Sequence, residues 1–454
     1  MNKPIRIANV QAFWGDYTRA AADMLRHDPE IDYLTLDYLA EVSMSILAKQ
    51  QSRKPELGFP LDFVKVVESI APYWKDGSKV RVIANAGGLA PRKCAEACAK
   101  VLAAAGCTGL KIGVVTGDSV LPIMRENNGD MPDFQNLDTG EPLGDHGASL
   151  ITSNAYVGAA SMVEALAAGC DLVITGRVAD PSMVVAPCAH AHGWSLGEYD
   201  KLAGATVAGH LIECGTQVTG GISTNWLELD EVDKIGYPII EVDDLGACVV
   251  TKAAGTSGRV NLRTVKEQLL YELGDPGNYL SPDCSVSFLS LTLDDLGNDR
   301  VHVSGAKGSP PPRTLKVSAT QHVGYHASGS LVIFGEHAVT KAKRAGQIVL
   351  DRLESQGKKA AESRVECLGA GATVPIPALQ RDDLMEVVLR VSVADPNRDV
   401  VSQFASDWTS LVCCGPQGTT GYAGGRPRVS ETYGYWPCLI DKKAVQMNVE
   451  VIEV

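Results

Sequence analysis

Three glycine-containing strings follow apolar runs in this sequence, and the first has the residue types of an anion-binding turn. The run Val80–Ala84 is followed by Asn85-Ala-Gly-Gly-Leu-Ala-Pro-Arg92. Adjacent Gly87 and Gly88 would let backbone N–H groups approach a ligand closely, and the next helix would point its positive end at an anion. The alternative is a tight structural turn between strand and helix. We take Asn85, Gly87 and Gly88 as candidate substrate-binding residues.

The second and third strings place charged side chains directly after strand-like runs. Leu110–Val115 is followed by Thr116-Gly-Asp118, and Leu172–Thr175 by Gly176-Arg-Val-Ala-Asp180. Arg177 is suited to a two-point grip on a carboxylate or phosphate. Asp118 could be a base or a helix N-cap, and Asp180 could be an acid/base or the structural partner of Arg177. Because ligands bind at the carboxyl ends of parallel strands, these residues predict a cleft there.

Two further strings carry candidates for acid–base chemistry and charge stabilisation. Gly209-His-Leu-Ile-Glu-Cys-Gly contains Glu213 beside Cys214, but sequence neighbours rarely face each other on a helix or strand. Glu213 is therefore the candidate acid/base, and Cys214 is interpreted as a small buried residue. Lys252 could stabilise charge on an anionic substrate, although its surroundings lack the Gly-x-x-x-x-Gly-Lys-Ser/Thr spacing of a nucleotide-binding loop.

The densest glycine cluster lies near the end of the chain, from Gly415 to Arg428. Such a loop could close over a substrate, dock on a neighbouring subunit or lie in solvent, and we take Arg426 as a candidate substrate-binding residue. His322 and His326 have the spacing of a metal-binding pair but lack the Glu that a zinc protease helix carries after its first His. No complete metal motif and no nucleotide motif is found, so the cofactor stays unknown.

The order of the predicted elements indicates an α/β protein. Strand-like runs of four to six apolar residues alternate with helical patterns such as Lys93–Ala105, which predicts βαβ units and a Rossmann-like, mainly parallel sheet. Runs rich in Thr, Val and Ser predict a β-rich elaboration over about residues 220–330. The polar stretch Gln356–Ser363 predicts a linker. We therefore expect an N-terminal α/β domain over residues 1–360 and a small C-terminal α/β domain over 362–454.

Composition restricts the class of ligand. The 454 residues carry a net charge of −13 without a dense Lys/Arg cluster, which argues against a nucleic-acid binder. No apolar run reaches the length of a membrane span, and the first residues show no apolar region with a cleavage site, so we expect neither a membrane span nor a secretory signal. The 12 cysteines are irregularly spaced within apolar segments, which indicates free thiols in a reducing compartment. We expect a cytoplasmic homo-oligomer with a small anionic substrate, without nucleic-acid or membrane partners.

Several of these strings, in this order, resemble those of the acyclic terpene utilisation (AtuA-like) family. The resemblance covers almost the whole chain. The strings that carry it are Ile83–Pro91, Gly176–Asp180, Gly209–Gly215, Thr251-Lys252 with the following Gly-x-x-Gly, Gln268–Glu272, Tyr279–Asp283, Val303–Gly305, Leu315–Val317 and Cys414–Pro427. Each string alone is short, and the ordered set is specific.

The resemblance implies degradation of citronellol- and geraniol-type acids as CoA thioesters. The expected activity is that of a lyase or hydratase on a branched acyl-CoA thioester or a related hydroxy acid. The alternative is a non-catalytic subunit of an acyl-CoA-metabolising complex. This sequence departs from the family at Phe13-Trp14-Gly15-Asp16, where members tend to have smaller residues before Gly-Asp. Asp16 is therefore a candidate substrate-binding residue in a bulkier lining.

Overall fold

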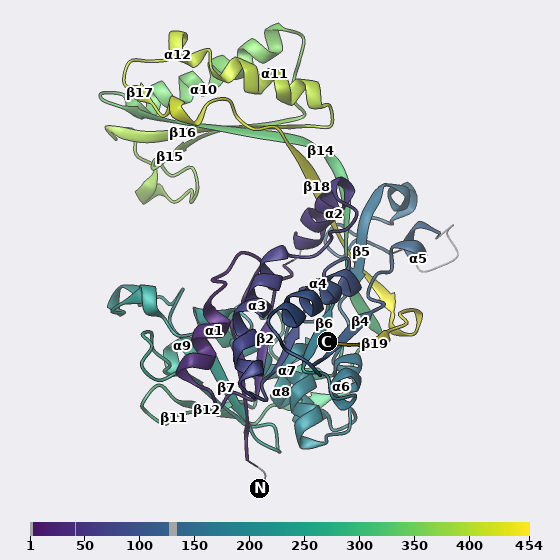
Figure 1. Cartoon of the computed structure of the whole chain (residues 1–454). Coiled ribbons are helices and arrows are strands. Elements are labelled where there is room, and N and C mark those ends of the chain that lie inside the picture. The colour runs from purple at the N-terminus through teal and green to yellow at the C-terminus, as the bar shows by residue number, and fades with distance from the viewer. Residues whose placement is uncertain (1–2, 41, 127–133) are drawn as a thin grey trace. The chain divides into compact units, whose positions relative to one another are not determined.

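Two separate stretches of sequence build the larger of the two units of this chain (Figure 1). Unit 1 comprises Met1–Thr320 and Tyr435–Val454, and unit 2 comprises Gln321–Gly434. The computed structural model describes residues 3–40, 42–126 and 134–454. The domain boundary expected between residues 360 and 362 falls inside unit 2, just before strand β15 (Glu362–Leu368), and stays a prediction.

Unit 1 is built on a ten-stranded sheet. Its strands, in spatial order, are β11 (Thr292–Asp295), β12 (Val301–Ser304), β8 (Cys248–Lys252), β7 (Pro238–Val242), β1 (Ile5–Asn9), β2 (Tyr33–Leu36), β3 (Arg81–Ala84), β6 (Leu172–Thr175), β4 (Lys111–Thr116) and β19 (Asn448–Glu453). The five strands from β1 to β4 in this order are parallel, and every other neighbouring pair is antiparallel. The expected α/β class is confirmed, but the sheet is mixed instead of mainly parallel, and a Rossmann-like fold is not confirmed.

Helices cover both faces of this sheet, because alternate residues of its strands point to opposite sides. Ile83 and Val173 enter one apolar core, whereas their neighbours Val82 and Leu172 enter the other. The first core is formed with α6 (Ala160–Ala167), α7 (Ser182–His192), α8 (Tyr199–Ile212) and α9 (Leu262–Leu270). The second core is formed with α1 (Ala20–His27), α2 (Ser43–Arg53), α3 (Leu61–Lys75) and α4 (Pro91–Ala104).

The remaining strands of unit 1 pair outside the ten-stranded sheet. A three-stranded sheet has the order β13 (Lys307–Ser309), β10 (Ser285–Ser287) and β9 (Tyr279–Leu280). Strand β5 (Leu150–Ala155) pairs with β14 (Thr314–Phe334), which also pairs with β18 (Ser430–Asp441). A short helix, α5 (Leu121–Arg125), lies against β5. The β-rich part expected over about residues 220–330 thus holds strands β7 to β13 and the start of β14.

Unit 2 has its own sheet and its own apolar core. The sheet order is β15, β16 (Glu386–Asp395), β14 and β17 (Thr419–Thr420), and its helices are α10 (Ala338–Ser355), α11 (Arg398–Trp408) and α12 (Leu411–Cys414). Val349 of α10 and Phe404 of α11 pack with Leu389 and Val391 of β16 in this core. None of the helices in the described part of the chain has the length and apolar character needed to cross a membrane.

Substitution of Gly204 tests how closely α8 packs against the turn between β7 and β8. A Cβ at this position would overlap the carbonyl oxygen of Gly246 in the turn between β7 and β8. We expect Gly204→Ala to lower the free energy of unfolding by about 1–3 kcal/mol, because backbone on both sides cannot move apart without disturbing the core. Urea unfolding measures the effect. Gly274→Ala, which meets open space, is the control, and an equal effect of both substitutions would contradict this packing.

Candidate functional site

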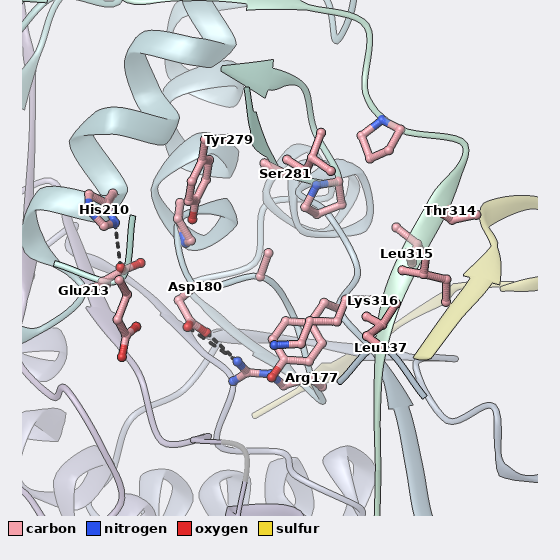
Figure 2. A pocket seen from close by; sticks show the side chains of 18 residues that line it. Leu137, Arg177, Asp180, His210, Glu213, Tyr279, Ser281, Thr314, Leu315 and Lys316 are labelled. Atoms are coloured by element: carbon pink, nitrogen blue, oxygen red, sulfur yellow. Dashed lines mark hydrogen bonds and ion pairs between the residues drawn. The ribbon is translucent and has the colours of Figure 1, made fainter. Parts of the chain in front are cut away.

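A cavity of about 400 Å³ lies beside the loop that follows β6 in unit 1 (Figure 2). Its charged lining combines Arg177 and Asp180 of this loop, His210 and Glu213 from the end of α8, and Lys316 of β14. Tyr156, Tyr279, Ser281, Thr314 and the exposed Glu272 also belong to the polar part of the lining. Strand ends and a helix end from distant parts of the sequence therefore meet around one cavity.

Arg177 is almost completely enclosed, with 2% of its surface exposed. Its Nη1 donates to the carbonyl of Leu39, and its Nη2 lies 3.1 Å from the Asp180 carboxylate. Its Cζ lies 4.1 Å from the centre of the Tyr156 ring, within cation–π range. The guanidinium is thus held by a carbonyl, a carboxylate and an aromatic face. Asp180 both contacts Arg177 and lines the cavity, so its position is compatible with a structural role and with an acid/base role.

Asp118 lies behind the cavity and holds the backbone of the Arg177 loop. Its Oδ2 accepts hydrogen bonds from the amide of Arg177 at 2.9 Å and from Nδ2 of Asn154 at 2.7 Å. Burial raises the pKa of the Asp118 carboxyl, and these two donors oppose part of the rise. Gly176 must be glycine, because a Cβ there would overlap the Asp118 carboxylate. Asp118 therefore supports the site, and the cavity lining does not include it.

Asn85 and the two glycines after it join neighbouring strand ends. The side-chain oxygen of Asn85 accepts from the amide of Tyr38, and its nitrogen donates to Asp37, both at 2.7 Å. The amide of Gly87 donates to the carbonyl of Thr175 at 3.0 Å, and that of Gly88 donates to the carbonyl of Asn85 at 3.3 Å. These groups have partners inside the protein, so the turn ties β2, β3 and β6 together.

Glu213 and His210 form a largely buried pair at the end of α8. His210 Nδ1 and Glu213 Oε1 are 3.0 Å apart, and the ring is 1% exposed. The rings of Tyr279 and Phe288 pack against His210 with centres 5.9 and 5.8 Å away. Gln268 Nε2 donates to the His210 carbonyl at 2.8 Å. Glu213 Oε2 is buried and has no hydrogen-bond partner among the described residues.

The surroundings favour a proton on this pair. Burial raises the pKa of the Glu213 carboxyl, the His210 ring opposes part of the rise, and the Asp180 and Glu272 carboxylates add to it. Burial alone would lower the pKa of His210, but the Glu213 carboxylate together with backbone hydrogen bonds to Leu269 and Gln268 more than offsets this, so the His210 pKa is raised. Burial also raises the pKa of the adjacent Cys214 to about 12, so its thiol is neutral at pH 7 and a poor nucleophile.

Comparison with protein families gives a match over nearly the whole chain. The model described as acyclic terpene utilisation family protein AtuA matches residues 5–451. The chain belongs to the AtuA family. The resemblance of the ordered strings is thereby confirmed, and the family takes part in the catabolism of acyclic terpenes. Searches of curated proteins and of solved structures gave no significant match.

Besides Asp118, Asn85, Gly87 and Gly88, three further predicted residues of this AtuA-family chain do not line the cavity. Asp16 accepts from Tyr237 Oη at 2.5 Å and lines a second cavity of about 630 Å³ beside α1. Lys252 Nζ donates to the carbonyl of Thr256 at 2.8 Å and lies 3.3 Å from Asp299. Arg426 is exposed on a loop of unit 2. In the described ranges of this AtuA-family protein, no group of three or more His, Cys, Asp or Glu could hold a metal ion.

The structure adds residues to which sequence reasoning gave no role. His210, Tyr279 and Lys316 lie in strings that carry the family resemblance, so a signal for their importance was present without a chemical reason. Tyr156 had no such signal. It enters the cavity because β5 pairs with β14, a pairing between segments more than 150 residues apart. The spacing of residues along the sequence does not predict such a long-range contact.

Asp118 should be needed for folding. Asp118→Ala removes the acceptor of two buried donors, the Arg177 amide and the Asn154 side chain. We expect the free energy of unfolding to fall by about 2–4 kcal/mol, because each stranded donor keeps its cost of desolvation. Chemical denaturation measures the loss. Asp230→Ala, at an exposed position, is the matched control and should change stability by less than about 0.5 kcal/mol.

Glu213 should make folding stability depend on pH. With a raised pKa, the folded protein keeps the carboxyl proton after the unfolded chain has released it near 4.5. The associated stability is present below that pH and is lost as pH rises toward the folded pKa. The raised pKa of His210 acts in the same direction above 6.5.

We therefore expect Glu213→Gln to gain stability relative to the native chain as pH rises from 4.5 to 8. Urea unfolding at several pH values measures the difference, with Glu164→Gln on the exposed face of α6 as the matched control. A difference that shrinks with rising pH would contradict the raised pKa.

Proposed function

We propose that this chain is an enzyme, a lyase or hydratase acting on a branched acyl-CoA thioester or a related hydroxy acid. The observation that supports it most directly is the Glu213 carboxylate at the cavity. Its Oε1 is held by His210 at 3.0 Å, and its buried Oε2 has no hydrogen-bond partner among the described residues. A carboxyl with a raised pKa and one uncommitted oxygen is suited to take and return a proton near neutral pH.

The same proton transfer serves either reaction. In the lyase form, Glu213 takes the proton of a 3-hydroxyl, the bond between C2 and C3 breaks, and its electron pair forms an enolate. C3 becomes a ketone carbon, and Glu213 returns the proton to C2. In the hydratase form, Glu213 takes a proton from water while the water oxygen bonds to C3 of an unsaturated thioester, and Glu213 then returns this proton to C2. Both forms balance without an added oxidant or reductant.

The rest of the lining supports an acyl ligand with an anionic part. Arg177 and Lys316 place positive charge at the cavity, where an enolate or carboxylate would be stabilised. Leu137, Leu280 and Leu439 line the same cavity and are 52%, 60% and 42% exposed. Such exposed apolar side chains gain most when a hydrocarbon covers them. Membership of a family named for acyclic terpene utilisation is consistent with a branched hydrocarbon.

Glu213→Gln tests this proposal on the purified chain with a branched 3-hydroxyacyl-CoA thioester. We expect kcat to fall by about 10²- to 10⁴-fold, because the amide cannot exchange a proton. Glu164→Gln should retain the native rate. Mass spectrometry of the products distinguishes the two reactions. A lyase yields a ketone and a shorter thioester, whereas the reverse of hydration yields an unsaturated thioester.

A folded Glu213→Gln variant with full turnover would remove Glu213 from the reaction. A native chain that binds the thioester but turns over none of these substrates would favour the alternative, a non-catalytic subunit of an acyl-CoA-metabolising complex. Thermal shift with the same thioester detects binding without turnover.

A further inference from the structure

Two cations of the cavity lie on one aromatic ring. Tyr156 follows β5, and its ring centre lies 4.1 Å from Cζ of Arg177 and 5.0 Å from Nζ of Lys316. Both distances are within the range of a cation–π contact. The amide of Tyr156 also donates to the carbonyl of Lys316 at 2.9 Å, so the pairing of the two strands fixes the ring beside the lysine. All three residues line the cavity.

The two cations, Arg177 and Lys316, differ in how accessible they are to a ligand. Arg177 is buried, and its guanidinium already contacts the Asp180 carboxylate and the Leu39 carbonyl. Asp37 also acts on it electrostatically. Lys316 is exposed and reaches the cavity from β14. Figure 2 shows its side chain on the Arg177 side of Asp180, whereas His210 and Glu213 lie on the other side.

This arrangement gives the Lys316 ammonium a preferred position. The long side chain of a lysine loses rotamer freedom when it binds a ligand, which costs affinity. An aromatic face that attracts the ammonium restricts the side chain beforehand and so lowers this cost. A ligand with a negative group then gains a charge-assisted contact. A neutral ligand of the same shape displaces water from the ammonium without that gain.

We infer that Lys316 is a specificity-determining residue, which selects ligands that carry a carboxylate or phosphate group, and that the Tyr156 ring is its positioning residue. The inference rests on the proposed function, because it concerns the same cavity. It assigns the two ends of the cavity to different tasks. The His210–Glu213 end exchanges the proton, and the Tyr156–Lys316 end recognises the charge of the ligand.

Calorimetric titration of the full-length chain tests the inference with three probes. They are 3-hydroxy-3-methylbutanoate, its uncharged methyl ester and its CoA thioester. We expect Lys316→Ala to bind an anionic probe about tenfold more weakly, the change that corresponds to about 1.4 kcal/mol. Binding of the methyl ester should be unchanged. Lys100→Ala removes the same charge from the exposed face of α4 and should leave every affinity unchanged.

The ring is tested with two substitutions. Tyr156→Phe retains the aromatic face and should keep the affinity for the anionic probe, whereas Tyr156→Leu should weaken it as Lys316→Ala does. In the Tyr156→Leu variant, the further substitution Lys316→Ala should weaken binding of the anionic probe by a smaller factor than it does in the native chain. Additive effects of the two substitutions would overturn the positioning role.

The probes also separate the two sources of negative charge. A loss with the free acid assigns a carboxylate to Lys316, and a loss with the CoA thioester alone assigns a phosphate. Equal losses for the acid and its methyl ester would overturn the inference, and so would unchanged or absent binding of both anionic probes. Failure of the proposed function is a different result, because it is seen as absent turnover, whereas this inference is measured by binding alone.

Discussion

The site of this protein depends on the contacts that hold the buried guanidinium of Arg177. A buried charge costs several kcal/mol unless nearby groups compensate it. Here the compensation comes from separate parts of the fold: the Leu39 carbonyl after β2, Asp180 after β6 and the Tyr156 ring after β5. Asp118, after β4, holds the Arg177 amide. One residue, through its side chain and its amide, therefore requires four strand ends to be in place, which positions the cavity wall.

The Glu213 end of the cavity follows the opposite principle. Its Oε1 is held by His210, but Oε2 and the side-chain oxygen of Gln268 are buried without hydrogen-bond partners among the described residues. Most buried polar atoms in proteins are satisfied, and exceptions concentrate where function requires a group to stay available. The cavity thus combines one charge held by several parts of the fold, which gives rigidity, with one incompletely engaged carboxylate, which gives reactivity.

The candidate site was partly readable from residue types at strand ends. Arg177 and Asp180 belong to one string and Glu213 to another, and the structure brings all three to one cavity. Their chemistry is local, since each follows an apolar run or ends a helix. Asp16 and Lys252 had equally suitable types, but each meets partners elsewhere in unit 1. Residue type indicates what a side chain can do, and only its neighbours in space decide whether it does so.

The sequence by itself determined the α/β class, the strand ends that carry polar groups and membership of the AtuA family. Periodicity records which face of an element is buried, and strand ends are local features. The tertiary structure decided the mixed sheet, with β19 from the end of the chain antiparallel to β4. It also placed Tyr156 and Lys316 beside Arg177. Strand direction and such contacts depend on long-range pairing, which no local pattern encodes.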